Sequence, residues 1–351
     1  MSDTIYRAAV IGLGFIGAGD EVRAEEIGQR VVDLCGSVHS DVLQAHPRTM
    51  LVAGASRDAG RRERFARRFP ATRAYADYRE MLRAEHLDVV SVAANTPAHA
   101  ELTVACAEAG VRCVFCEKPL ATSLADADRM LATCAAHGTM LVVNHNRRWH
   151  PTYHAARQAL ADGAIGDVVC VYAHWPSGRL GNVGTHVFDA LHLVMRERII
   201  AVSGTLDRTG RPDCRGAQYH DPGGWGIVRF AGGTHGFVEA SETLPAQVGL
   251  GLRFVGNTGE MALSDRGCLV TVHRGETVQV AGPADDVVTM RLAVDEIVNA
   301  LDMGTPPTST GEDGRAALEV IIGFHASDRR QGQWVDLPLT GQDRQIEVQI
   351  G

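Results

Sequence analysis

An apolar run near the start of the chain ends in three closely spaced glycines. Residues 6–14, YRAAVIGLG, have the pattern of a buried parallel strand, and the glycines at its end are Gly12, Gly14 and Gly17. In a strand–turn–helix unit the first glycine permits a tight turn, the second lets the backbone approach a pyrophosphate, and the third lets the helix pack against the strand. The motif, with Phe15 and Ile16 between its last two glycines, therefore predicts a dinucleotide-binding site.

Strands and helices alternate after this turn. Further apolar runs predict strands at 49–55, 88–94, 111–116 and 139–144. Helical periodicity fills the gaps at 59–68, 77–84, 98–109 and 124–137. This order predicts a doubly wound parallel sheet, and hence a Rossmann domain over residues 1–145.

The pattern changes beyond about residue 165. Candidate strands then follow one another mostly without helices, at 167–174, 201–207, 226–231, 234–241, 250–256 and 268–273. Helices are predicted near 150–162, 184–195, 289–302 and 312–328. A second, α+β domain over residues 146–351 with a large, mostly antiparallel open sheet fits this pattern, as does a length of 351 residues, which is long for one core. We expect the helix near 312–328 to pack back on the first domain.

Charge and composition exclude several classes of protein. The net charge of −8 argues against a general nucleic-acid binder. The apolar runs fall short of the ~18 residues that a membrane span needs, and no basic leader precedes the first strand, so we expect a cytoplasmic location. The eight cysteines are expected to be reduced. Cys113 and Cys116 fall in one predicted strand and face opposite sides, so neither a metal site nor a redox pair is expected there.

The end of the second predicted strand carries the residues that would read the adenosine ribose. An acid at this position favours a free 2′-hydroxyl, whereas a small polar residue with an arginine suits a 2′-phosphate. The sequence here is Ala55-Ser56-Arg57-Asp58. Ser56 and Arg57 favour NADP as the cofactor, while Asp58 leaves NAD open as the alternative.

Several motifs together resemble a known family. Besides the glycines, they are Asn95-Thr96-Pro97 with His99, Glu117-Lys118-Pro119, an arginine–aromatic–x-proline segment within 146–168, and the C-terminal stretch from residue 306. The chain resembles the glucose–fructose oxidoreductase / inositol dehydrogenase / rhizopine-catabolism (Gfo/Idh/MocA) family. The resemblance implies nicotinamide-dependent oxidation or reduction of sugars, cyclitols and related polyols. It also implies a homodimer or homotetramer through the open sheet, with no nucleic-acid or membrane partner expected.

Lys118 follows directly on an apolar strand, where ligands bind in doubly wound folds. The resemblance places its side chain beside the nicotinamide, with Glu117 and the Asn95, Thr96, Pro97 and His99 segment also at the cofactor. It further implies a cis peptide bond before Pro119. An ammonium group at this place can polarise a carbonyl or donate a hydrogen bond to an alkoxide.

The segment LGNVGTHVFDALHLV, residues 180–194, resembles the helix motif D-x-x-x-H of that family. The resemblance makes His186 the catalytic histidine and Asp189 the later aspartate. Asn182 stands where the family has its first aspartate, and an amide neither carries charge nor takes a proton. We therefore expect His186 to act as the base and Lys118 to stabilise the developing oxygen charge. Asn182, which can share a helix face with His186, is expected to orient the substrate.

Further residues are candidates for substrate contact. Aromatic rings can stack on sugars, and arginine can hold a carboxylate or phosphate; these candidates are Arg148, Trp149, Trp175 and Arg179, beside Asn182 and Asp189. His186, Asp189 and His192 have no evident fourth ligand, so no metal is expected.

One departure from the family is an extra stretch of roughly twenty residues at 18–36, which either caps the cleft or decorates the surface. Two other functions stay open beside the oxidoreductase. One is redox-neutral, NAD-dependent glycoside cleavage. The other is a non-catalytic cofactor-binding regulator.

Overall fold

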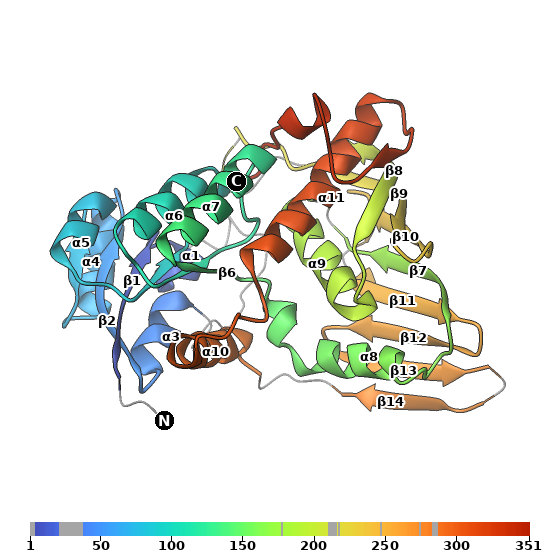
Figure 1. Ribbon diagram of the computed structural model, residues 1–351, viewed down its shortest axis with the longest axis horizontal. Helices are drawn as coiled ribbons and strands as arrows, with labels where there is room; N and C mark the ends of the chain where they lie inside the picture. Colours follow the sequence, from blue (N-terminus) through green and yellow to red (C-terminus); the bar gives the residue numbers. More distant parts are fainter. Residues whose placement is uncertain are drawn as a thin grey trace. The chain divides into compact units, whose positions relative to one another are not determined.

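The computed structural model describes residues 4–20, 38–176, 178–209, 216, 218–245, 248–273, 275–282 and 287–351. The chain divides into two compact units that interleave along the sequence (Figure 1). The first comprises Met1–Ala121, Asp126–Asn146 and Val288–Asp313. The second comprises Thr122–Ala125, Arg147–Val287 and Gly314–Gly351. A single domain boundary after residue 145 stays a prediction.

The first unit contains a six-stranded sheet in the order β3-β2-β1-β4-β5-β6, with every neighbouring pair parallel. Its strands are β1 (Tyr6–Ile11), β2 (Thr49–Ala55), β3 (Arg73–Tyr75), β4 (Val89–Val92), β5 (Cys113–Cys116) and β6 (Met140–Val143). This confirms the predicted Rossmann sheet. The strand order reverses between β1 and β4, and the carboxyl ends of strands at such a point form the usual ligand crevice.

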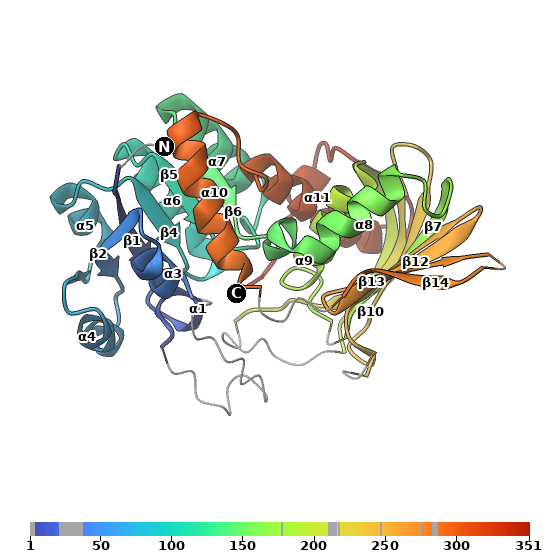
Figure 2. The same cartoon turned by 90° about the horizontal axis from the view of Figure 1, so that it is seen from below.

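Helices cover both faces of this sheet (Figure 2). Right-handed crossovers place the helices that follow β1 and β2 on one face and those that follow β3, β4 and β5 on the other. The helices are α1 (Phe15–Ala18), α3 (His39–Ala45), α4 (Ala59–Arg68), α5 (Tyr78–Ala84), η1 (Thr96–Ala98), α6 (His99–Glu108), α7 (Leu124–His137) and α10 (Thr289–Met303).

The helix that opens at the glycine turn, α1, is short. It has four residues and is capped by Gly19, which is left-handed with φ 65°. A second helix, α3, is tied to it through Ser40, whose hydroxyl donates to the Gly17 carbonyl at 2.7 Å. Arg68 of α4 also joins them, since its guanidinium donates to the Ala18 carbonyl and to Asp41, each at 2.6 Å. Most of the extra stretch predicted at 18–36 lies outside the described residues.

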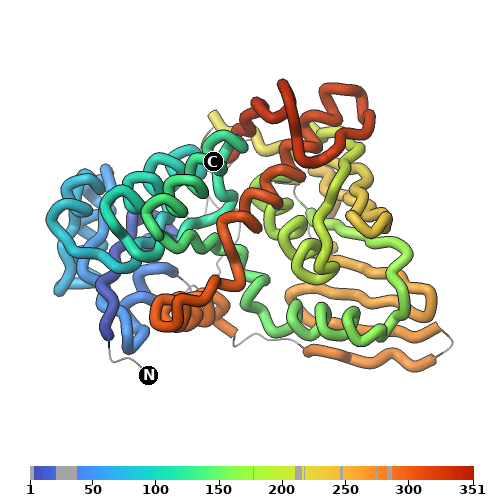
Figure 3. The backbone as a smooth tube through the Cα atoms, viewed as in Figure 1, coloured from blue at the N-terminus to red at the C-terminus, as the bar shows by residue number. Residues whose placement is uncertain are grey.

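The second unit contains a nine-stranded sheet in the order β14-β13-β12-β11-β7-β10-β9-β8-β15. Its strands are β7 (Val168–His174), β8 (Ile199–Asp207), β9 (Gly223–Phe230), β10 (His235–Ala240), β11 (Gly251–Gly256), β12 (Gly259–Ser264), β13 (Gly267–Val272), β14 (Thr277–Ala281) and β15 (Val335–Asp336). Among these described strands β7 and β10 pair in parallel and all other neighbours are antiparallel. The predicted mostly antiparallel sheet is thus confirmed. The C-terminal chain, red in Figure 3, supplies β15 at the edge beside β8.

The helical elements of the second unit are η2 (Asn146–Trp149), α8 (Pro151–Ala161), α9 (Gly184–Met195), α11 (Gly311–Arg329) and η4 (Asp343–Gln345). α9 and α11 pack through Phe188 and Phe324, whose stacked rings lie 5.7 Å apart and are fully buried. α10 belongs to the first unit and most of α11 to the second. The predicted packing of residues 312–328 on the nucleotide-binding domain concerns the placement of the two units and stays a prediction. None of the described helices combines the length and apolar character that crossing a membrane would require.

Candidate active site

The glycine turn after β1 has room for backbone only. Gly12 has φ 98°, and a methyl group there would lie 2.5 Å from the Ala93 carbonyl oxygen. A methyl group at Gly17 would lie 1.9 Å from the Gly12 carbonyl oxygen. At Gly14, by contrast, the nearest neighbour of such a group is the Arg61 side chain at 3.6 Å. The first and third glycines therefore permit close backbone packing, while the second leaves its backbone open to a ligand, as a pyrophosphate requires.

The acid in the segment after β2, Asp58, already accepts a hydrogen bond from the chain. Asp58 caps α4 by accepting the Arg61 backbone N–H at 2.8 Å, and this bond holds the pKa of the Asp58 carboxyl below its ordinary value. Arg62 donates to the carbonyl oxygens of Ser56 and Arg57, both at 2.8 Å. The side chain of Arg57 is exposed. The cation and the small polar residue predicted to read the ribose thus lie on a loop that Arg62 and Asp58 hold in place.

Lys118 lies two residues beyond the end of β5, in a loop that neighbouring segments hold. The peptide bond between Lys118 and Pro119 is cis, which confirms the prediction. The buried ring of His99 faces the carbonyl oxygen of Pro119 with Nδ1 and that of Ala94 with Nε2, both at 2.9 Å. Both contacts are hydrogen bonds only when both ring nitrogens carry a proton. His99 therefore ties the lysine loop to the end of β4.

A buried carboxylate lies directly before the lysine. Glu117 is 7% exposed, and its Oε1 lies 3.0 Å from His39 Nε2 and accepts the Asn144 side-chain amide at 2.6 Å. Its Oε2 accepts the backbone N–H of Lys118 at 3.3 Å, and His39 Nδ1 lies 3.0 Å from the Ser91 hydroxyl. Burial alone would raise the pKa of Glu117. The hydrogen bond and charge of His39, then the charge of Lys118 and the Asn144 bond, outweigh burial and lower the pKa to about 2. Glu117 is therefore ionised at neutral pH.

Two residues predicted at the cofactor thus point inward. The contacts of Glu117 and His99 position the lysine loop, and their predicted cofactor contacts stay predictions, as do those of Asn95, Thr96 and Pro97. No sequence motif points to His39 and Asn144, which bind Glu117, or to Ser91, which lies 3.0 Å from His39. A further feature of the sequence marks this loop: Lys118 is the only lysine of the chain, whose other basic residues are arginine or histidine.

The second unit carries Asn182 and His186. α9 begins at Gly184, so Asn182 lies in the turn before the helix and His186 in its first turn. Asn182 and His186 were predicted to share a helix face, but only His186 belongs to the helix. Both side chains are half-buried. The two oxygens of Asp221 accept the backbone N–H groups of Gly181 and Asn182, at 2.6 and 2.7 Å.

Several predicted substrate residues have structural partners. Arg148 Nε donates to both oxygens of Asp189, at 2.8 and 2.9 Å, and both side chains are buried. Trp175 is fully buried, donates its indole N–H to the Gly178 carbonyl at 2.8 Å, and exposes no ring face for a sugar. Trp149 is also buried, at 6% exposure. Their substrate contacts stay predictions, whereas Asn182 and the half-buried Arg179 keep exposed surface.

No metal ligand set is evident in the part of the chain that the structure describes, where no cluster of three or more His, Cys, Asp or Glu side chains is arranged around one point. Cys113 and Cys116 are both fully buried, and burial raises the pKa of each thiol.

Comparison with known proteins gives a consistent picture. Residues 6–145 match the model of an oxidoreductase family with an NAD-binding Rossmann fold, and residues 153–262 match the GFO/IDH/MocA C-terminal domain. Inositol 2-dehydrogenase 1 of Saccharopolyspora erythraea is 30% identical over 331 residues, covering 90% of this chain and 91% of that protein. D-apiose dehydrogenase of Paraburkholderia graminis is 35% identical over 162 residues, or 46% of this chain, which spans only 38% of that relative's length. The structure of levoglucosan dehydrogenase with NADH and levoglucosan shares the fold, with a TM-score of 0.78, 19% identity, and coverage of 96% of this chain and 100% of that one.

Proposed function

Because the chain belongs to the GFO/IDH/MocA family of oxidoreductases with an NAD-binding Rossmann fold, we propose that it is a dehydrogenase of sugars, cyclitols or related polyols. It transfers a hydride between a nicotinamide cofactor and a secondary alcohol or ketone of the substrate. The observation that carries this proposal is the place of Lys118, the only lysine of the chain. It lies at the carboxyl end of a Rossmann strand, directly after the buried carboxylate of Glu117, which accepts its backbone N–H.

The chain's own residues fit such a cofactor. The open backbone at Gly14, between two glycines that admit no side chain, suits a pyrophosphate. We assign the adenosine end to Ser56 and Arg57 and favour NADP, because the Asp58 carboxylate already caps α4. NAD is the alternative. When bound, the cofactor supplies the hydride acceptor or donor.

Lys118 acts as a fixed cation in this proposal. The ionised Glu117 beside it favours the ammonium form of the lysine, since a nearby opposite charge stabilises a charged group. The ammonium group then donates a hydrogen bond to the substrate oxygen and stabilises the negative charge that develops as its proton leaves. A lysine suits this role better than an arginine, because its charge is compact and its donors can rotate.

His186 takes the hydroxyl proton in this scheme. A carbinol carbon releases hydride only as its hydroxyl loses a proton, and a neutral imidazole is suited to accept it. Asn182 cannot accept that proton, but its amide can donate to and accept from substrate hydroxyls. It therefore orients the substrate.

Asn182 also favours a second candidate. Redox-neutral, NAD-dependent glycoside cleavage is one alternative to a simple oxidation. The other is a non-catalytic cofactor-binding regulator, and an amide that cannot take a proton fits such a protein. Copurified cofactor without net turnover would favour the first, and cofactor binding without chemistry on any sugar would favour the second.

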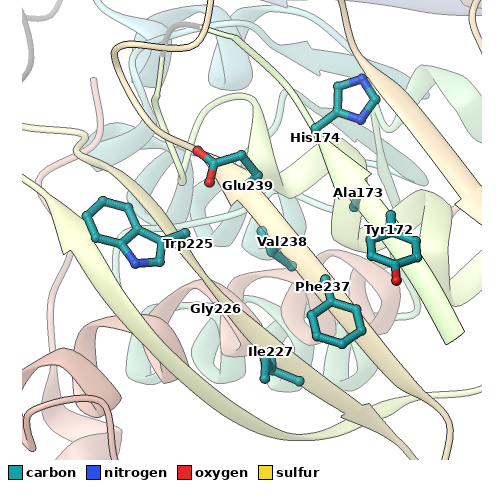
Figure 4. A pocket seen from close by; sticks show the side chains of 9 residues that line it. All are labelled: Tyr172, Ala173, His174, Trp225, Gly226, Ile227, Phe237, Val238 and Glu239. Atoms are coloured by element: carbon teal, nitrogen blue, oxygen red, sulfur yellow. The ribbon is translucent and has the colours of Figure 1, made fainter.

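The open face of the nine-stranded sheet supports a homodimer or homotetramer as part of the proposal. Tyr172, Trp225 and Phe237 are 43%, 44% and 39% exposed there, and the rings of Tyr172 and Phe237 stack 5.1 Å apart. They border a hollow of about 440 Å³ (Figure 4). Exposed aromatic clusters of this kind mark interaction surfaces. Light scattering tests the assembly: Phe237→Asp should give monomers, and a monomeric wild type would contradict it. A cytoplasmic location stays a prediction.

The reaction is tested by a substrate screen. Sugars and cyclitols are offered with NAD or NADP, and the absorbance of the reduced nicotinamide is followed. We expect turnover with at least one secondary alcohol and a preference for NADP. No turnover with any substrate in either direction would refute the dehydrogenase.

A further inference from the structure

The turn before the proposed catalytic helix is held by a carboxylate from a distant part of the chain. Asp221 lies in the loop before β9, and its Oδ1 accepts the Gly181 N–H while its Oδ2 accepts that of Asn182, at 2.6 and 2.7 Å. Each oxygen thus has its own backbone donor. Hydrogen bonds to an ionised acceptor are shorter and stronger than neutral ones.

The loop that carries Asp221 is itself anchored on both sides. The Leu180 N–H donates to the Pro222 carbonyl at 2.8 Å, directly beside the carboxylate. The His220 N–H donates to the Gln349 carbonyl at 2.9 Å. From the same C-terminal segment, Ile350 packs so closely on Gly181 that a methyl group there would lie 2.3 Å from its Cδ1. Asp221 therefore has little freedom to leave the turn.

The Asp221 carboxylate also places a negative charge beside Asn182, whose side chain is neutral. The two N–H groups that it binds come just before α9, which begins at Gly184. Negative charge is favourable near the N-terminal end of a helix. Asp221 thus satisfies donors of this turn and adds a negative charge next to Asn182.

We propose that Asp221 is a positioning residue for the active site. It clamps the Gly181–Asn182 turn, which carries Asn182 and leads into the helix of His186, and it provides this turn with the negative charge that the amide of Asn182 lacks. The proposal rests on the proposed dehydrogenase function, because the effect of Asp221 is measured as a change in the kcat of that reaction. Asp221 itself acts through Asn182 and His186.

The first variant is Asp221→Asn, which keeps the shape of the side chain and one acceptor oxygen but loses the charge and the second acceptor. We expect kcat to fall by about ten-fold to a hundred-fold, the scale of a lost charge-assisted hydrogen bond. The KM for the cofactor should stay unchanged, because the cofactor-binding residues belong to the other unit.

Moving the charge separates its role from a merely structural one. Asn182→Asp in the Asp221→Asn background restores a carboxylate at the same turn and should recover most of the lost turnover. Asn182→Asp alone should lower kcat, because Asp221 already supplies the charge and two adjacent carboxylates repel. A ten-fold gain from Asn182→Asp alone would contradict the proposal, and this test does not depend on whether the Asp221→Asn protein folds.

Asp207→Asn is the matched control. Asp207 is another carboxylate of the second unit that accepts two backbone N–H groups, those of Thr209 and Glu242, both at 3.0 Å. It should leave kcat within about two-fold of wild type. Equal losses in the two variants, or a kcat of Asp221→Asn within two-fold of wild type, would overturn the proposal. So would a double variant no better than Asp221→Asn.

Amide hydrogen exchange tests whether Asp221 holds the Gly181–Asn182 turn, and this measurement needs no substrate. The amides of Gly181 and Asn182 should exchange faster in Asp221→Asn than in wild type, and at the wild-type rate in Asp207→Asn. Unchanged exchange in Asp221→Asn would refute the clamp. A wild type without turnover on any substrate would instead refute the proposed function, so the two failures are distinguishable.

Discussion

The loop of Lys118 and the turn before α9 are held in different ways. Around Lys118, the buried side chains of His39 from α3 and of Asn144 just after β6 bind one carboxylate, Glu117, and Ser91 of β4 lies 3.0 Å from His39. Before α9, a half-buried carboxylate from a loop, Asp221, binds backbone N–H groups. The first arrangement fixes the position and charge of one side chain. The second fixes the path of the backbone at Gly181 and Asn182, directly before the helix that carries His186.

This difference has a consequence for how each region tolerates change. A buried ionised group that loses a partner leaves a costly uncompensated charge or donor. Altering a backbone clamp with solvent nearby costs less stability, because water can replace part of its hydrogen bonding. We therefore expect substitutions around Lys118 to affect both chemistry and stability, and substitutions before α9 to affect mainly chemistry.

The largest effect is expected at Lys118 itself. Lys118→Ala removes the donor to the developing oxygen charge and should lower kcat by about 10²–10³-fold. Fluorescence titration should show that the cofactor still binds. Lys118→Arg keeps the charge but not the compact ammonium, and should retain part of the activity. Full activity of Lys118→Ala on a confirmed substrate would show that the Lys118 loop does not contribute to catalysis, and would contradict the role given to it here.

Glu117→Gln should affect turnover and stability together. Losing the buried charge leaves the donors of His39 and Asn144 poorly matched, which costs about 1–3 kcal/mol of stability. We expect kcat to fall about ten-fold, because the ammonium form of Lys118 loses its support. Denaturant unfolding and steady-state kinetics measure the two effects. A fall in kcat with unchanged stability would contradict the buried network.

The pH dependence of stability gives an independent reading of Glu117. Its pKa in the folded protein is lowered from 4.5 to about 2, so the folded state binds the proton less readily than the unfolded state. The carboxylate therefore contributes stability that is fully present above about pH 4.5 and is lost as the pH falls toward about 2. Wild type should lose more stability across this window than Glu117→Gln. Parallel losses in the two proteins would show that Glu117 is not ionised at a low pKa.

The smallest effect on turnover is expected away from both regions. Arg57→Ala should weaken NADP binding by about 1.5–3 kcal/mol, the range of a charge-assisted hydrogen bond, and leave NAD binding and kcat nearly unchanged. Arg67→Ala, another exposed arginine on the following helix, is the control. Equal losses for NADP and NAD, or a wild-type preference for NAD, would refute the NADP assignment.

The sequence predicted the elements with strong periodicity. The predicted strand 49–55 and helix 184–195 coincide with β2 and α9, because the first is a short, nearly continuous apolar run and the second has apolar residues at helical spacing. β3 was missed because its three residues, RAY, have no buried position. β14, at the edge of its sheet, is exposed along most of its length, although its residues, TVQVA, alternate between polar and apolar. It was not predicted from the sequence.

The site was predicted only where residues are close in sequence. Lys118 and His186 lie in local motifs, whereas His39 and Asn144, which bind Glu117, are 78 and 27 residues away from it in the sequence. Asp221 is 39 residues from Asn182 and belongs to no motif. Hydrogen bonds of this kind depend on the tertiary fold, and a single sequence does not contain their geometry.

The central claim is that Lys118 remains a cation and leaves the proton transfer to His186. Because Lys118 is the only lysine, protein labelled with ¹⁵N and ¹³C in lysine alone gives a single side-chain signal in NMR. We predict that this signal keeps the shifts of an ammonium group through neutral pH in the cofactor-bound protein, and that Glu117→Gln moves its titration to lower pH. A signal that is already that of a neutral amine at neutral pH would contradict the account and make Lys118 the base.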